Sequence, residues 1–217
     1  ARIDAGDAVP QSRGSQAAVA LLDPRPGERV LDLCAGPGIK TTAIAARMEN
    51  RGELVSIEAD PRRAEELAAL CARAGVGCAR VEVADAAEAD LGAGYDRILL
   101  DPPCTDLGTL ASRPDARWRK SPDARERLAS LQRRLLVRAA RALRPGGTLV
   151  YSTCTISARE NEEVAAAAPG YAEVEVDDLG AERRRLASRR DGRFLQLLPE
   201  RDRTAGFFIA RFKRPER

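Results

Sequence analysis

The chain has 217 residues, a length that suits one compact domain whose core needs neither a disulfide nor a metal to hold it together. Hydrophobic residues make up 44% and charged residues 32% of the sequence, a balance that excludes disordered and fibrous proteins. The formal net charge is only +3, and no apolar run approaches the roughly 20 residues that a membrane span requires.

The sequence contains no histidine and five cysteines. The lack of imidazole excludes Ser-His-Asp triads, Cys-His dyads and most zinc sites. The cysteines form no C-x-x-C pair and their number is odd. We therefore expect neither a disulfide framework nor a metal site, and a reducing, cytoplasmic location. We also expect a monomer with no membrane partner.

Short apolar strands alternate with helices along the chain. Asp60-Pro61 and Ser121-Pro122 each combine an N-cap with a first-turn proline, which indicates two helix starts. Strands are predicted at residues 30–33, 54–57, 79–83, 98–100, 148–151, 172–176 and 207–212, and helices at 40–48, 61–75 and 122–144. Residues 177–193 are expected to form a polar loop. The β-α-β alternation predicts a doubly wound, mostly parallel α/β sheet with helices on both faces.

Ligands of such a sheet bind beyond the carboxyl ends of its strands. Four segments there carry reactive or polar groups: residues 32–40, Glu58, residues 101–104 and residues 152–155. Because these segments end neighbouring strands, we expect them to converge on one edge of the sheet.

The first of these segments predicts a nucleoside-bearing cofactor. Gly36 and Gly38 permit close backbone approach to a ligand, but Thr41 breaks the G-x-G-x-x-G pattern of a pyrophosphate cradle. That break argues against a nicotinamide dehydrogenase. Glu58 can accept two hydrogen bonds from ribose hydroxyls. S-adenosylmethionine is the common cofactor that combines a nucleoside with no pyrophosphate.

Two cysteines stand out as candidate nucleophiles. Cys104 follows a Pro-Pro pair, and Cys154 lies between two threonines, each just beyond a strand end. Cys34 lies in the cofactor turn, where packing is the expected role. A cysteine nucleophile needs a lowered pKa, and Lys40 is the only lysine expected near this edge.

At these motifs the sequence resembles the RNA (cytosine-C5)-methyltransferases of the RsmB type, also called the Fmu/Sun or NSUN family. The likeness extends from Gln11 to Lys213. It is carried by these runs: LDLCAGPGIKTT at residues 31–42, DPPC at 101–104, RPDARW at 113–118, STCT at 152–155, ENE at 160–162 and GFF at 206–208. Two cysteines in the DPPC and STCT motifs are a highly specific signal.

The resemblance implies the fold of class I S-adenosylmethionine-dependent methyltransferases, with a seven-stranded, Rossmann-like sheet and an antiparallel C-terminal strand. Residues 1–217 would then be a single catalytic domain, with residues 1–27 leading into the core. The implied substrate is RNA, with ribosomal RNA the first choice and transfer RNA the second.

The resemblance also implies roles for individual residues. Cys154 would add to carbon 6 of cytosine, because carbon 5 is a poor nucleophile until carbon 6 is saturated. Cys104 would assist the later elimination, and Asp101 would hydrogen-bond the base, which must be unstacked to be reached. The implied residues around S-adenosylmethionine are Cys34, Ala35, Gly36, Pro37, Gly38, Ile39, Lys40, Glu58, Asp85 and Asp101.

Three positions depart from the family pattern. Ile39 replaces the usual second glycine of P-G-G-K-T, Glu58 stands where Asp is commoner, and Ser12 stands where the N-terminal motif usually has Asp. None of these changes removes a chemical group that the reaction requires.

Two other functions remain open at this point. In DNA cytosine-5 enzymes the cysteine after the fourth strand is the nucleophile, so Cys104 would act in place of Cys154. Alternatively, the chain is a catalytically silent RNA-binding module that uses a basic surface around Arg117, Arg119 and Lys120. The segment 113–144 carries eleven basic and three acidic residues, and a second basic run covers 183–193. We expect the first segment to present arginines beside the active site.

Overall fold

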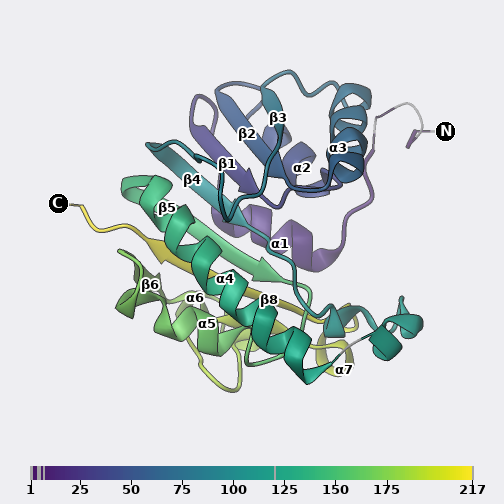
Figure 1. The fold of residues 1–217 in the computed structure, drawn as a ribbon, viewed down its shortest axis with the longest axis vertical. Helices are drawn as coiled ribbons and strands as arrows, with labels where there is room; N and C mark the ends of the chain where they lie inside the picture. Colours follow the sequence, from purple (N-terminus) through teal and green to yellow (C-terminus); the bar gives the residue numbers. More distant parts are fainter. Residues whose placement is uncertain (1, 4–5, 7, 120, 217) are drawn as a thin grey trace.

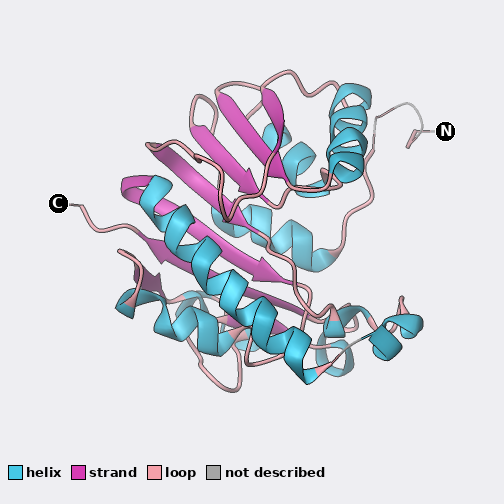
Figure 2. Cartoon of the chain, viewed as in Figure 1, coloured by secondary structure: helices cyan, strands magenta, loops and turns pink. Residues whose placement is uncertain are grey.

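A twisted sheet runs through the centre of the molecule, with helices on both of its faces (Figure 2). This computed structural model describes residues 2–3, 6, 8–119 and 121–216. Its strands are β1 (Arg29–Leu33), β2 (Glu53–Glu58), β3 (Ala79–Val83), β4 (Tyr95–Leu100), β5 (Leu143–Thr153), β6 (Glu175–Asp177), β7 (Leu195–Leu197) and β8 (Phe207–Lys213). The α-helices are α1 (Arg13–Leu22), α2 (Ile39–Arg47), α3 (Pro61–Arg73), α4 (Pro122–Ala142), α5 (Glu162–Ala167), α6 (Leu179–Glu182) and α7 (Pro199–Asp202).

The strand order places the reversal of the winding between β1 and β4. The order is β3-β2-β1-β4-β5-β8-β6, and β7 pairs with β8 beside this path. The five strands from β3 to β5 pair in parallel, whereas β8 runs antiparallel to β5, β6 and β7. The carboxyl ends of β1, β2, β4 and β5 therefore meet at one edge, where ligands of doubly wound sheets bind.

Alternate residues of the central strands divide the core into two layers. Leu31 and Leu33 of β1 belong to the layer covered by α4 and α5, and Val30 belongs to the layer covered by α1 and α2. Figure 1 shows α4 crossing one face of the sheet while α1 lies on the other. This arrangement confirms the predicted doubly wound α/β fold.

The predicted helix starts are confirmed by their caps. The Asp60 side chain accepts hydrogen bonds from the backbone amides of Arg62 and Arg63 ahead of α3, and Ser121 accepts one from Ala124 in α4. Helix α4 ends at Ala142, because β5 already begins at Leu143.

The C-terminal third departs from the sequence prediction. An eighth strand, β7, joins the predicted seven. It was not predicted because the buried Gln196 interrupts its short apolar pattern. Strand β6 covers 175–177 rather than 172–176, and the expected polar loop at 177–193 holds α6, which Asp178 caps, and a 3₁₀ turn (Arg184–Leu186). The N-terminal segment also contains α1. Among the described helices, none is long and apolar enough to span a membrane.

Candidate active site

The two candidate thiols lie side by side. Cys104 follows β4 through the rigid Pro102-Pro103 pair, and Cys154 follows the last residue of β5. Because β4 and β5 are parallel neighbours, their carboxyl ends bring the two Sγ atoms to 3.4 Å from each other. Two thiols from segments 50 residues apart thus form one reactive pair.

Asp106 completes this cluster, although it was not among the predicted site residues. Its backbone is left-handed, with φ of 54°, and Oδ1 lies 3.0 Å from the Sγ of Cys154 and 3.3 Å from that of Cys104. The ligand atoms of these three residues lie within 4.8 Å of one another, a donor set suited to a soft divalent metal. The expected absence of a metal site stays a prediction.

The environment of Cys104 disfavours its ionisation. The hydrogen bond with Cys154, together with burial, raises the pKa of Cys104 well above its ordinary value, so Cys104 keeps its proton at neutral pH. Burial likewise raises the pKa of Cys34, and it raises the pKa of Cys71 to about 11. Cys34 and Cys71 are therefore poor nucleophiles, in agreement with the packing roles expected from the sequence.

Asp101 is held from both sides next to the thiols. Lys40 Nζ lies 2.6 Å from its Oδ2, and the Ser152 hydroxyl donates to its Oδ1 at 3.0 Å. Burial lowers the pKa of Lys40, but the charge and hydrogen bond of Asp101 outweigh this and raise it overall. The lysine therefore remains a cation, and the carboxylate of Asp101 has a fixed orientation.

A cavity of about 780 Å³ connects the predicted cofactor residues with the thiols. Glu58, at the end of β2, and Asp85, beyond β3, line it together with Cys104 and Cys154, which follow β4 and β5 on the other side of β1. Asp101 lies on the wall as well. This volume falls in the range of ligand sites, roughly 300–1,000 Å³. Cys34 and Pro37 also line it.

The backbone of the first loop depends on its two glycines. The amide of Gly36 donates to Glu58 Oε2 at 2.9 Å, and a Cβ at position 36 would lie only 2.5 Å from that oxygen. Gly38 has φ of 102°, which side chains rarely tolerate. The other Glu58 oxygen accepts from the Asp60 amide at 3.0 Å. Each carboxylate oxygen retains a further lone pair for a ribose hydroxyl.

A buried carboxylate under this loop supports a cationic ligand there. Asp32 is 1% exposed; its Oδ2 accepts from Thr41 at 2.7 Å, while its Oδ1 has no partner. Burial raises the pKa of Asp32 to about 7. Together with Ala35 and Lys40, Asp32 lines a void of about 30 Å³ in the loop. The residues present therefore fit S-adenosylmethionine, which carries positive charge on its methionine end.

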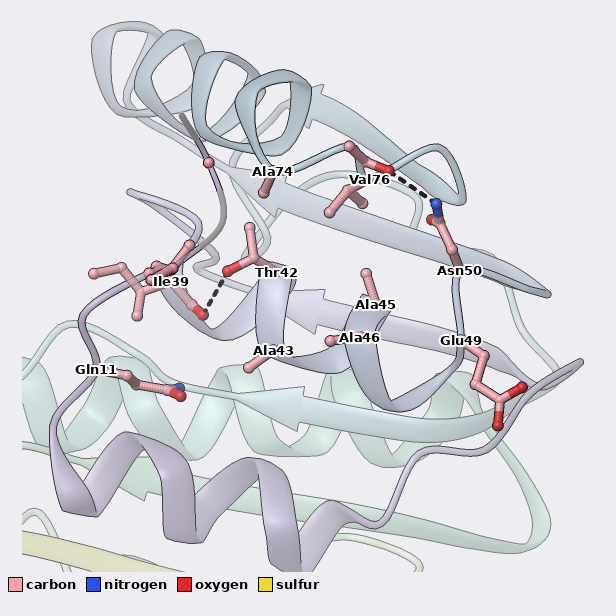
Figure 3. A pocket seen from close by; sticks show the side chains of 14 residues that line it. Gln11, Ile39, Thr42, Ala43, Ala45, Ala46, Glu49, Asn50, Ala74 and Val76 are labelled. Carbon is pink, nitrogen blue, oxygen red and sulfur yellow. Dashed lines mark hydrogen bonds between the residues drawn. The ribbon is translucent and has the colours of Figure 1, made fainter. Parts of the chain in front are cut away.

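Ile39 is not among the residues that line the large cavity, and neither are Ala35, Gly36, Gly38 and Lys40. The side chain of Ile39 lines a second cavity of about 410 Å³, formed with Gln11, Thr42 and Val76 behind the loop (Figure 3). Ile39 also reaches the small void around Asp32. The structure thus gives its side chain a packing position, which explains how the turn accommodates a residue other than glycine.

The predicted basic surface is only partly placed beside the site. Arg113 lines the large cavity, and Arg117 is exposed. Arg138 instead donates to the carbonyl of Ala86 at 2.8 Å, and Arg144 pairs with Asp96, so these two stabilise the fold. Lys120 lies outside the described residues.

Leu135 of α4 belongs to the core and Leu131 packs against it, and both also line the large cavity. Trp118, from the RPDARW run, is 83% exposed. Ser152 and Glu160 were not predicted as site residues, although both lie within motifs that carry the resemblance.

The comparisons with known proteins agree with this geometry. The model of the family 16S rRNA methyltransferase RsmB/F matches residues 19–213. The chain is 36% identical to the probable ribosomal RNA small subunit methyltransferase B of Bacillus subtilis, over 96% of the chain and 48% of that protein. It is 42% identical to the tRNA (cytosine(49)-C(5))-methyltransferase of Pyrococcus abyssi, over 72% of the chain and 50% of that protein.

A solved structure gives the same result. The structure of NSun6 from Pyrococcus horikoshii with SFG superposes with a TM-score of 0.89 at 31% identity, covering 100% of this chain and 55% of that one. The chain spans about half the length of the curated relatives it matches. The match over nearly all of its residues shows that the chain belongs to the RsmB/F family of 16S rRNA methyltransferases, which depend on S-adenosylmethionine.

Proposed function

We propose that this chain transfers a methyl group from S-adenosylmethionine to carbon 5 of a cytosine in RNA, with Cys154 as the covalent nucleophile. The observation that carries the proposal is the pair of thiols, 3.4 Å apart, in the same cavity as Glu58 and Asp85. A reactive sulfur and a nucleoside site in one cavity are what this reaction requires.

The raised pKa of Cys104 argues against it as the nucleophile, and the resemblance assigns that role to Cys154. Cys104 keeps its proton, because its hydrogen bond with Cys154 and its burial raise its pKa. Cys154 Sγ would bond to carbon 6 of the cytosine, and the electron pair of the 5,6 double bond would become available at carbon 5. After methylation, a water molecule would take up the carbon 5 proton, and the electron pair of that C–H bond would re-form the double bond and expel the Cys154 thiolate. The Cys104 thiol, in contact with that sulfur, would assist this release.

Asp101 would orient the base. Its carboxylate lies on the cavity wall and is fixed by Lys40 and Ser152. Glu58, Asp85 and the loop from Cys34 to Lys40 would hold the cofactor, whose sulfonium supplies the methyl group when bound. The leucines at the cavity, Leu131 and Leu135, would limit the access of water to the reacting carbon.

The decisive experiment traps the covalent intermediate. RNA containing 5-fluorocytosine blocks the release step, because the fluorine replaces the proton that must leave. The protein should form an RNA adduct that survives denaturation, and peptide mapping should place it on Cys154. An adduct on Cys104 would instead establish the alternative nucleophile. Absence of any adduct, in a protein that binds both RNA and cofactor, would favour the silent RNA-binding module.

Ribosomal RNA is the substrate that we propose first. The matching family is described as 16S rRNA methyltransferases, whereas one relative is described as a tRNA methyltransferase. Bisulfite sequencing of both RNA classes, from cells with and without the gene, would identify the modified cytosine. Loss of a 5-methylcytosine from transfer RNA alone would overturn the ribosomal assignment and leave the chemistry intact.

A further inference from the structure

A buried carboxylate lies behind the two thiols and contacts both of their loops. Glu160 is fully buried, in the short segment that follows Cys154. Its Oε2 accepts a hydrogen bond from the backbone amide of Thr105 at 2.8 Å, and its Oε1 accepts one from the Thr105 hydroxyl at 2.5 Å. Thr105 directly follows Cys104, so Glu160 holds the Cys104 loop by two bonds.

The same network continues into the Cys154 loop. The hydroxyls of Thr105 and Thr155 lie 2.8 Å apart, and Thr155 directly follows Cys154. The Thr105 hydroxyl has one proton, which it donates to Glu160, so it must accept from Thr155. Thr155 in turn accepts from the backbone amide of Ser157 at 3.2 Å. The donors therefore run in one direction, from Ser157 through both threonines to Glu160.

A third element anchors the carboxylate. Gln132, from α4, donates to Glu160 Oε2 at 3.2 Å and to the carbonyl of Pro103 at 2.9 Å. The hydroxyl of Tyr151, on β5, donates to the backbone carbonyl of Glu160 at 2.6 Å. These bonds tie the backbone on both sides of Cys104 to the strand that carries Cys154.

Burying a charged side chain rarely makes a protein more stable than burying an apolar residue of similar size. The best-supported role of such a group is to hold neighbouring segments of the chain in one arrangement. Every side-chain bond of Glu160 described above leads to the Cys104 loop or to its anchor on α4. We propose that Glu160 is a positioning residue that sets the spacing of the Cys104 and Cys154 thiols through Thr105 and Thr155. The importance of that spacing for release of methylated RNA rests on the proposed function.

The test uses two variants and two matched controls. Glu160→Leu removes the carboxylate, and Thr155→Val removes only the hydroxyl that links the loops. Glu162→Leu removes another buried carboxylate of the same segment, which bonds the Ser188 hydroxyl at 2.5 Å. Thr153→Val removes a hydroxyl that bonds Asn161 at 2.6 Å. Neither control bond joins the two cysteine loops, and thermal melting would show that the variants remain folded.

The first readout is independent of methyl transfer. Phenylarsine oxide condenses with two adjacent thiols, forming two As–S bonds and releasing water, so its affinity reports on their spacing. We expect Glu160→Leu and Thr155→Val to lower that affinity at least tenfold, and both controls to stay within about twofold of the parent protein. Equal losses of arsenical affinity in the test and control variants would overturn the proposal. If Glu160→Leu does not fold, an unchanged arsenical affinity in Thr155→Val would overturn it.

The second readout separates the spacing from the chemistry. If the thiols separate, release should slow, so Glu160→Leu and Thr155→Val should accumulate covalent RNA adduct in the presence of cofactor, at least fivefold above the controls. A loss of arsenical binding with no RNA adduct in any variant, Cys104→Ala included, would refute the covalent function and leave the spacing role standing. Adduct levels equal to the controls, with Cys104→Ala accumulating adduct, would show that the spacing does not matter for release.

Discussion

Lys40 Nζ lies 2.6 Å from Asp101 Oδ2, and this ion pair joins the two halves of the site. Lys40 belongs to the first turn of α2, behind the cofactor loop, whereas Asp101 begins the segment that leads to Cys104. Their side chains are only 14% and 25% exposed, so solvent screens the pair weakly. Binding of the cofactor and positioning of the base should therefore be coupled.

A double-mutant cycle measures this coupling. Lys40→Met leaves the carboxylate of Asp101 partly buried without its cation. Asp101→Asn leaves the ammonium group of Lys40 partly buried without its anion. Because each single variant strands a charge, we expect their losses in S-adenosylmethionine affinity to be non-additive by about 1–2 kcal/mol. Titration calorimetry of the parent, both single variants and the double variant gives the value. Additive losses within about 0.5 kcal/mol would show that the two residues act separately.

Cys154→Ala should abolish methyl transfer and leave cofactor affinity nearly unchanged. The thiol follows β5, three strands along the sheet from β2, which ends at Glu58, so its removal should take away the proposed nucleophile and little of the cofactor site. Incorporation of labelled methyl groups into RNA and calorimetry with the cofactor measure the two effects. Turnover within about tenfold of the parent, a barrier change of only ~1.4 kcal/mol, would be too small for the loss of a covalent nucleophile.

Cys104→Ala should have the opposite effect on the intermediate. Cys104 contacts the Cys154 sulfur and keeps its proton, so its loss should slow release and not the initial attack. A denaturing gel after incubation with RNA and cofactor should show a shifted band. The band should vanish in the Cys104→Ala/Cys154→Ala double variant. If neither single variant gives a shifted band, Cys104 has no role in release.

The central strands and the two thiols could be predicted from sequence because local signals specify them. Each of these signals spans only a few neighbouring residues. They are apolar runs, helix caps such as Asp60, and polar residues just beyond strand ends. Asp106 could not be predicted, because its proximity to both thiols depends on a left-handed turn and on how two loops meet. The role of Gln196 was hidden for a similar reason. Its amide accepts from Asn161 inside the protein, and such a partner is not visible in a linear sequence.

Asp32 should make cofactor binding depend on pH. Burial raises its pKa to about 7 in the folded protein, from about 3.9 in an unfolded chain. The folded state therefore holds more protons than the unfolded state between these values, and Asp32 lowers stability as the pH rises from about 4 through 7, by a total on the order of 4 kcal/mol. A cationic ligand beside this carboxylate favours the ionised form.

We consequently expect cofactor binding to release about half a proton at pH 7, and almost none at pH 9, where Asp32 is already ionised. Calorimetric titrations in two buffers of different ionisation enthalpy measure the released proton. The variant Asp32→Asn should release no proton on cofactor binding. Its free energy of unfolding should no longer fall between about pH 4 and 7. Equal proton release by the parent and the variant would exclude Asp32 as its source.

Arg113 and Arg117 should contribute to RNA binding through phosphate contacts. Arg113 lines the large cavity and Arg117 is exposed a few residues further on, whereas Arg138 and Arg144 of the same basic segment are engaged within the fold. Each phosphate contact contributes a slope of roughly −0.7 to a plot of log K against log salt for single-stranded nucleic acid. Neutralising both residues as glutamine should flatten that slope by about 1.4 if each touches one phosphate.

Arg47 and Arg73 provide the matched control. Both are exposed, and they end α2 and α3, whose N-termini begin at the cofactor edge, so the two arginines lie toward the opposite edge of the sheet. The double variant Arg47→Gln/Arg73→Gln has the same change in net charge but should leave the salt slope unchanged. Cofactor affinity should stay the same in the control pair. A slope that falls equally in both double variants would mean that RNA responds to the net charge of the protein, and the arginines beside the cavity would then have no local role in binding it.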